Sequence, residues 1–127
     1  MKLHLLIIDP QNDFCNPAGS LFVPGADSDM DRLATLIDRL RPKLDDIHIT
    51  LDSHRMVDIS HPLWWRGSAG VNPAPFTQIT AGAVEAGTWT TAMPGARTRS
   101  LEYLRALEAT GRYPHVVWPE HCLIGDE

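Results

Sequence analysis

The first apolar run of the chain, "LHLLIID", extends from Leu3 to Asp9 and is almost unbroken before it ends in a carboxylate. Continuous apolar runs of this length are typical of strands that are buried on both faces of a parallel sheet. A second run, "DIHITLDSH", repeats this plan, with apolar residues leading to Asp52 and His54. We therefore predict two parallel strands with functional side chains at their carboxyl ends.

Between these strands, apolar residues recur at helical spacing from Asp29 to Leu44. Acidic residues occupy the first turn, where they complement the helix dipole, and Pro42 marks the far end. The apolar positions are Met30, Leu33, Leu36, Ile37, Leu40 and Leu44. Strand, helix and strand together predict a βαβ unit.

Two more elements are predicted in the last third of the chain. A helix is expected from Arg97 to Thr110, with leucines on one face and Gly111 as its C-cap. The segment "HVVW", residues 115–118, predicts a third short strand. The expected fold class is therefore α/β with a parallel sheet.

Residues 53–96 are rich in Pro, Gly, Thr and Trp and show no sustained period. A connection of this length in a compact domain is usually a lid or a binding loop. The alternative is a poorly ordered insertion. We favour the lid because four large aromatic residues supply more apolar area than disordered segments carry. They are Trp64, Trp65, Phe76 and Trp89.

Composition limits the class of function. A chain of 127 residues that is 43% hydrophobic suits one domain with an ordinary core. Its 11 Lys and Arg against 16 Asp and Glu give a net charge of −5 without a basic run, which argues against nucleic acid and for a small-molecule partner. The apolar start is too short for a membrane span or a signal segment. Cys15 and Cys122 are far apart, which favours a reducing cytoplasm over a disulfide framework.

Two predicted strand ends carry candidate metal-binding side chains. Asp52 and His54 are separated by one residue, so in extended chain they point to the same side, and His121 follows the third predicted strand. A carboxylate and two imidazoles suit a divalent transition metal, with zinc, manganese and iron as candidates. The alternative is ordinary core or surface histidines. His61 is a fourth candidate, although a loop histidine before Pro62 is the simpler interpretation.

Asp9 ends the first predicted strand and is well placed to hold and shift a proton. Two alternatives remain open: Asp9 caps the following turn, or Asp13 takes the catalytic role. Cys122 is not expected to be a nucleophile activated by His121, because consecutive side chains on extended backbone diverge.

Four segments in order carry a resemblance to a known family. They are "IIDPQNDFCNPAGSLFVPGA" at 7–26, "TLDSH" at 50–54, "DISHPLWW" at 58–65 and "WPEHCLIG" at 118–125. Together they resemble the isochorismatase-like cysteine hydrolases, most closely the nicotinamidase branch. The similarity extends from Met1 to about Gly125, so residues 1–127 are expected to be the N-terminal part of one such domain.

The resemblance implies a Rossmann-like αβα sandwich with a parallel sheet. It also implies a Cys-Lys-Asp triad that hydrolyses an amide such as nicotinamide through a thioester-linked acyl-enzyme. Asp9 matches the triad aspartate, and the metal ligands match Asp52, His54 and His121. Phe14 and Trp118 match residues of the substrate pocket. Cys122 matches a position that is not the nucleophile.

The chain departs from the family pattern after "WPEHC". The family's lysine follows on the next strand and its nucleophilic cysteine comes later, at a helix N-terminus, whereas this sequence stops at Glu127. We therefore expect a domain truncated after about three strands, inactive as an amidase, with an open sheet edge that favours self-association. A lysine and then a cysteine should follow in the full reading frame.

Two other functions were weighed against this one. A hydrolase could use a metal-bound water in place of the cysteine. A non-catalytic metal-binding or ligand-binding module is also compatible with the sequence. A receiver-like domain is disfavoured because the only lysines, Lys2 and Lys43, lie at the chain start and in a predicted helix.

Overall fold

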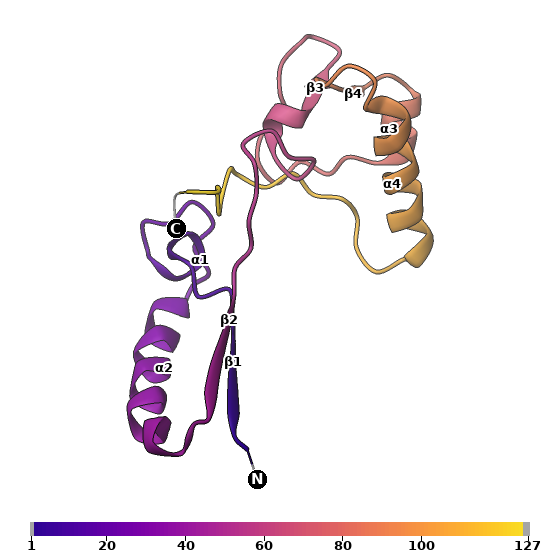
Figure 1. Cartoon of the computed structure of the whole chain (residues 1–127). Helices are drawn as coiled ribbons and strands as arrows, with labels where there is room; N and C mark the ends of the chain where they lie inside the picture. Colours follow the sequence, from indigo (N-terminus) through magenta and orange to yellow (C-terminus); the bar gives the residue numbers. More distant parts are fainter. Residues whose placement is uncertain (1, 126–127) are drawn as a thin grey trace. The chain divides into compact units, whose positions relative to one another are not determined.

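The structure is a computed structural model that describes residues 2–125 (Figure 1). The chain divides into two compact units. The first comprises Met1–His54 and His121–Glu127, and the second comprises Arg55–Glu120. No helix in the described part of the chain is long and apolar enough to cross a membrane.

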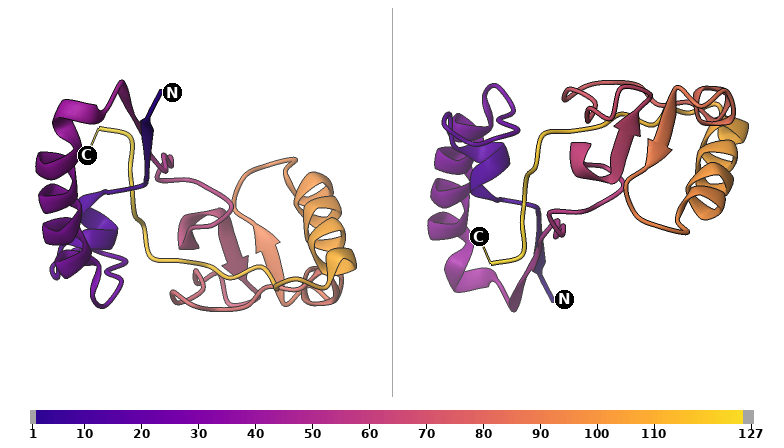
Figure 2. Two further views of the ribbon diagram at one scale, coloured as in Figure 1. Left: turned by 90° about the horizontal axis from the view of Figure 1, so that it is seen from below. Right: turned by 90° about the horizontal axis from the view of Figure 1, so that it is seen from above.

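The first unit is built on a βαβ arrangement, as predicted. Strands β1 and β2 pair in parallel, with His4 opposite Asp46 at one end and Ile8 opposite Thr50 at the other. Helix α2 connects them and runs alongside the strand pair (Figures 1 and 2). The elements are β1 (His4–Ile8), α1 (Asn12–Cys15), α2 (Ala26–Leu40), the 3₁₀ turn η1 (Arg41–Lys43) and β2 (Asp46–Thr50).

Helix α2 begins three residues before the predicted start at Asp29 and ends before the predicted Leu44. Gly25 precedes it with φ 93°, a conformation that glycine adopts without steric cost. At the other end, Pro42 has no N–H to donate and lies in η1. The apolar stripe of the helix is half-buried, as the periodicity predicts.

The predicted burial of the first strand on both faces is wrong for the described residues. Ile7 is 8% exposed, whereas its neighbours Leu6 and Ile8 are 58% and 69% exposed. Side chains alternate between the faces of a strand, so one face of the β1–β2 pair is open. The apolar run predicts the strand correctly. Burial of all its side chains would require elements packed on both faces of the sheet.

The strand predicted at 115–118 is also wrong. Val116 makes only an isolated antiparallel bridge with Gln78, and prolines flank the segment at 114 and 119. Beyond the end of β2, His54 forms an isolated parallel bridge with Leu123. The His54 N–H donates to the Cys122 carbonyl at 2.9 Å, and the Ile124 N–H donates to the His54 carbonyl at 3.0 Å. Figure 2 shows this C-terminal segment, in yellow, within the first unit.

The second unit has its own short elements, so residues 53–96 are not a poorly ordered insertion. Strands β3 and β4 pair antiparallel, with Trp65 opposite Thr91. Helix α4 has the predicted bounds, and Gly111 ends it with φ 62°. The elements are η2 (Pro62–Trp64), β3 (Trp65–Gly67), α3 (Ala81–Glu85), β4 (Trp89–Thr91) and α4 (Arg97–Thr110).

A small apolar core holds the second unit together. Its buried members come from β3, α3, α4 and the segments between them: Trp65, Ile79, Ala81, Val84, Leu104 and Val117. The Trp65 indole N–H donates to the Ile59 carbonyl at 2.8 Å, which satisfies its one polar atom inside the core. Trp64 and Trp89 pack against this core, whereas Phe76 is 61% exposed, so three of the four aromatic residues in 53–96 mark a core.

Candidate functional site

Asp9 lies directly after β1 and is held by the neighbouring strand. The Thr50 hydroxyl donates to Asp9 Oδ1 at 2.6 Å, and the Asp9 N–H donates to the Thr50 carbonyl at 3.1 Å. Asp9 has φ 50°, in the left-handed region that few non-glycine residues adopt. The strand end thus turns sharply at Asp9 and fixes its carboxylate on the carboxyl side of the sheet.

Asp52 is positioned through its backbone by the buried side chain of Gln11. The Gln11 amide nitrogen donates to the Asp52 carbonyl at 2.9 Å, and the Asp52 N–H donates to Gln11 Oε1 at 2.7 Å. Gln11 is 6% exposed, so both bonds are shielded from water. Because the amide supplies one donor and one acceptor, it pairs with the Asp52 backbone as a neighbouring strand would.

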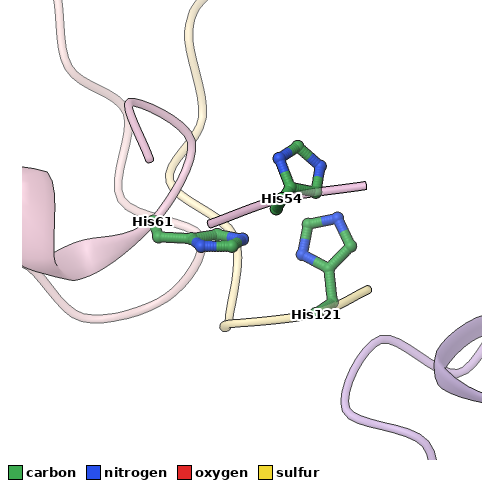
Figure 3. Close-up of side chains that lie close together, drawn as sticks. All are labelled: His54, His61 and His121. Carbon is green, nitrogen blue, oxygen red and sulfur yellow. The ribbon is translucent and has the colours of Figure 1, made fainter. Parts of the chain in front are cut away.

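His54 and His121 converge on one oxygen of Asp52. His54 Nε2 lies 3.0 Å from Asp52 Oδ2, and His121 Nε2 lies 3.5 Å from the same atom. The two imidazole rings lie side by side, with centroids 4.8 Å apart (Figure 3). The predicted trio therefore meets in the first unit, although its members are far apart in sequence.

The two separations from Asp52 Oδ2 are close to those between ligands of one metal ion. In a tetrahedral site with bonds of about 2.0–2.1 Å, two ligand atoms are about 3.3 Å apart, close to the 3.0 and 3.5 Å observed here. The exposed fraction of the side chains rises from His121 at 5% through His54 at 18% to Asp52 at 34%. A carboxylate and two imidazoles are donors that could hold a zinc-class ion.

The C-terminal segment is anchored beside this trio by Asp13. The Cys122 N–H donates to Asp13 Oδ2 at 2.6 Å, and Cys122 has φ 47°, again in the left-handed region. Burial raises the pKa of Asp13, but hydrogen bonds from the Cys122 and Ser20 backbones outweigh it and leave that pKa below its ordinary value. Asp13 therefore positions the backbone of Cys122, the residue that follows His121.

The two predicted substrate-binding residues lie in different units. In the first unit, the Phe14 ring meets the His121 ring edge-on at 5.7 Å. In the second unit, the backbone N–H of Trp118 donates to the Ser60 carbonyl at 2.7 Å. The centroid of the Trp118 ring lies 5.8 Å from that of the Phe76 ring. His61 also belongs to the second unit, where it is buried.

Sequence reasoning missed Gln11 and the anchoring role of Asp13. Both lie in "DPQNDF", where the aspartates drew attention as proton carriers. Gln11 gave no clear signal, because the sequence does not show that its side chain is buried against backbone groups. Thr50 gave no signal, because threonine is an ordinary strand residue.

Comparison with known proteins gives matches to solved structures only. No protein-family model and no curated protein sequence matches the chain. Two solved structures of the yeast nicotinamidase Pnc1p match it in fold, one of them bound to the inhibitor nicotinaldehyde. Each has a TM-score of 0.57 and 24% sequence identity, and the match covers 97% of this chain and 44% of that chain.

The chain therefore spans less than half the length of the yeast enzyme whose fold it shares. The similarity to nicotinamidases that the motifs predicted is confirmed at the level of the fold. The described residues form a mixed α/β structure with a two-stranded parallel sheet.

Proposed function

We propose that this chain is the N-terminal portion of a nicotinamidase-like cysteine hydrolase and carries the metal-binding half of its active site. One observation carries the proposal: two histidine Nε2 atoms converge on a single oxygen of Asp52 beside the strand end that bears Asp9. In open α/β sheets this carboxyl edge is where ligands bind. The fold shared with yeast nicotinamidase supports the same assignment.

Each residue has a role in this proposal. Asp52, His54 and His121 hold a divalent ion, zinc in the first instance and manganese or iron otherwise. The ion would supply a positive charge that orients a polar atom of the substrate. Asp9 is the triad carboxylate, and its hydrogen bond from Thr50 keeps it oriented and available as a proton carrier.

The substrate is a small amide such as nicotinamide. Phe14 presents an aromatic ring next to His121, which suits a flat heteroaromatic substrate. Trp118 is assigned to the same role from its motif alone. The catalytic lysine and cysteine are expected beyond residue 127, within one domain of which residues 1–127 are the first part.

Further parts of the proposal concern the complete domain. The open face of the β1–β2 pair would be covered there by helices, giving a Rossmann-like sandwich. Cys15 is a free thiol, and a reducing cytoplasm is the proposed location. Association into a homo-oligomer is compatible with the open face.

The metal assignment is tested by titrating the tag-free chain with Zn²⁺ in a calorimeter. We expect binding that is weakened at least about tenfold in His54→Gln and in His121→Gln, because each change removes one of three ligands. Asp27→Asn, an exposed change on α2, is the matched control. Unchanged Zn²⁺ affinity in His121→Gln would exclude this ligand set.

The catalytic assignment is tested by measuring ammonia release from nicotinamide. The chain alone should release none, since the proposal places the nucleophile and its lysine elsewhere. Turnover that disappears in Cys122→Ser would instead make Cys122 the nucleophile. Turnover that survives cysteine alkylation but not a chelator would identify a hydrolase that works through the metal alone.

The fragment assignment is tested in the DNA. Reading beyond codon 127 in all three frames should reveal a lysine and, after a further strand and helix, a cysteine. If no frame encodes either, the chain is a different protein from the one proposed.

A further inference from the structure

A second cluster of metal-binding side chains lies at the opposite end of the β1–β2 pair. His4 in β1 is directly opposite Asp46 in β2, and His48 follows Asp46 by two residues. Residues opposite one another or two apart on paired strands share a face, so all three side chains project from the same face of the sheet. All three are exposed.

The separations within this cluster fit one ion. His4 Nδ1 lies 3.1 Å from His48 Nε2, and His48 Nε2 lies 3.6 Å from Asp46 Oδ2. The ligand atoms of all three lie within 4.8 Å of one another. A tetrahedral zinc-class ion needs separations of about 3.3 Å, so small rotations of exposed side chains would complete the geometry.

The two imidazoles face each other through one ring nitrogen each. The rings are stacked almost parallel, with centroids 5.4 Å apart and 3° between their planes. One proton between the facing nitrogens gives a hydrogen bond between two neutral rings, whereas two protonated rings would repel each other. A divalent cation lets both facing nitrogens act as electron-pair donors at once, with the Asp46 carboxylate contributing negative charge.

We propose that His4, Asp46 and His48 form a second divalent transition-metal site, selective for zinc-class ions and open to solvent at the remaining position. Because the ligands come from both strands, an ion bound there links β1 to β2. Binding to the folded form alone stabilises that form, so the first unit should become more stable as the free metal concentration rises. The site is independent of the proposed hydrolase function, since it shares no residue with the Asp52, His54 and His121 trio.

The test uses the tag-free full chain, titrated with Zn²⁺ by calorimetry and with Co²⁺ by visible absorption. We expect two Zn²⁺ equivalents for the wild type and one for His48→Gln. Glutamine can still hydrogen bond to His4, so a cluster that serves only as a hydrogen-bonded pair would be unaffected by this change. Asp27→Asn again serves as the control for loss of an exposed polar side chain.

The reciprocal variant separates this proposal from the proposed function. A chain with His54→Gln and His121→Gln should keep one Zn²⁺ equivalent, with zinc-dependent shifts confined to the ring nitrogens of His4 and His48 in ¹⁵N NMR spectra. Wild-type stoichiometry and affinity in His48→Gln would overturn the second site. Absence of those shifts in the reciprocal variant would overturn it as well, whatever the trio does.

Discussion

Gln11 organises the candidate site without offering it a ligand. Its amide pairs with both backbone groups of Asp52, and its own N–H donates to the Asp9 carbonyl at 2.8 Å. Gln11 is buried and holds the backbone of Asp52, and so it helps to orient the carboxylate that the two histidines share. Groups of this kind, which orient metal ligands without touching the ion, typically change metal affinity when they are removed.

Replacement of Gln11 by alanine should weaken Zn²⁺ binding about 10–100-fold, because Asp52 loses the contacts that orient it. Unfolding of the first unit should become easier by about 1–3 kcal/mol, since buried backbone groups are left without partners. Calorimetry and urea unfolding measure the two effects. Gln78→Ala is the matched control, because Gln78 is exposed and lies in the second unit. Equal zinc affinity in the two variants would contradict the positioning role.

At the scale of elements, periodicity predicted the long helices and the first two strands but not the short elements. Helix α4 has the predicted bounds because it runs for several turns and ends at Gly111. Strands β3 and β4 have three residues each, too few to display a period of two. The apolar "HVVW" segment was misassigned because its backbone bonds go to irregular segments, such as Val117 N–H to the Thr77 carbonyl.

The candidate site was largely predictable for a different reason. Asp9, Asp52 and His54 follow strand-like runs, and strand ends gather at one edge of a parallel sheet. The strand expected to position His121 was predicted at residues 115–118, which was the wrong segment. The position of His121 depends instead on the pairing of Leu123 with His54. That pairing joins residues remote in sequence, which local patterns do not encode.

His115, which lies just beyond α4, makes the second unit sensitive to acid. Burial lowers its pKa despite a hydrogen bond to the Ile59 carbonyl at 3.1 Å. The unfolded chain therefore binds its proton more readily than the folded unit does. The contribution of neutral His115 to stability is fully present above the ordinary histidine pKa of about 6.5 and is lost as the pH falls through the lower folded-state value.

We therefore expect the second unit to unfold at lower urea concentration at mildly acidic pH than at neutral pH, with a smaller difference in His115→Gln. Tryptophan fluorescence reports this unit selectively, because Trp64, Trp65, Trp89 and Trp118 all lie within it. A chelator is added to all samples, so that pH-dependent metal binding does not contribute to the difference in unfolding. An identical pH dependence in the variant would show that another group is responsible.

At the scale of the molecule, the open face of the β1–β2 pair is the main liability. Leu6 and Ile8 project from it beside the backbone of two short strands. Exposed apolar strands promote association between chains unless something covers them. The chain should therefore bind a hydrophobic dye and associate increasingly with concentration.

Paired replacement of Leu6 and Ile8 by threonine should reduce both effects, because threonine favours strands but presents less apolar surface. Sedimentation velocity and dye fluorescence provide the measurements. Val71→Thr is the control, since Val71 is 67% exposed but lies in the second unit. A wild-type chain that stays monomeric at high concentration without binding the dye would refute this expectation.

The bridge between His54 and Leu123 has a consequence for the order of folding. Asp52 and His54 are neighbours from the moment they are synthesised, but His121 reaches them only after the chain has closed a loop of residues 55–120. Closing a long loop costs entropy before any contact compensates for it. An ion held by the trio would therefore stabilise the state in which this loop is closed. Zinc present during refolding should favour the chain in which His121 contacts Asp52 and His54 over the chain in which it does not.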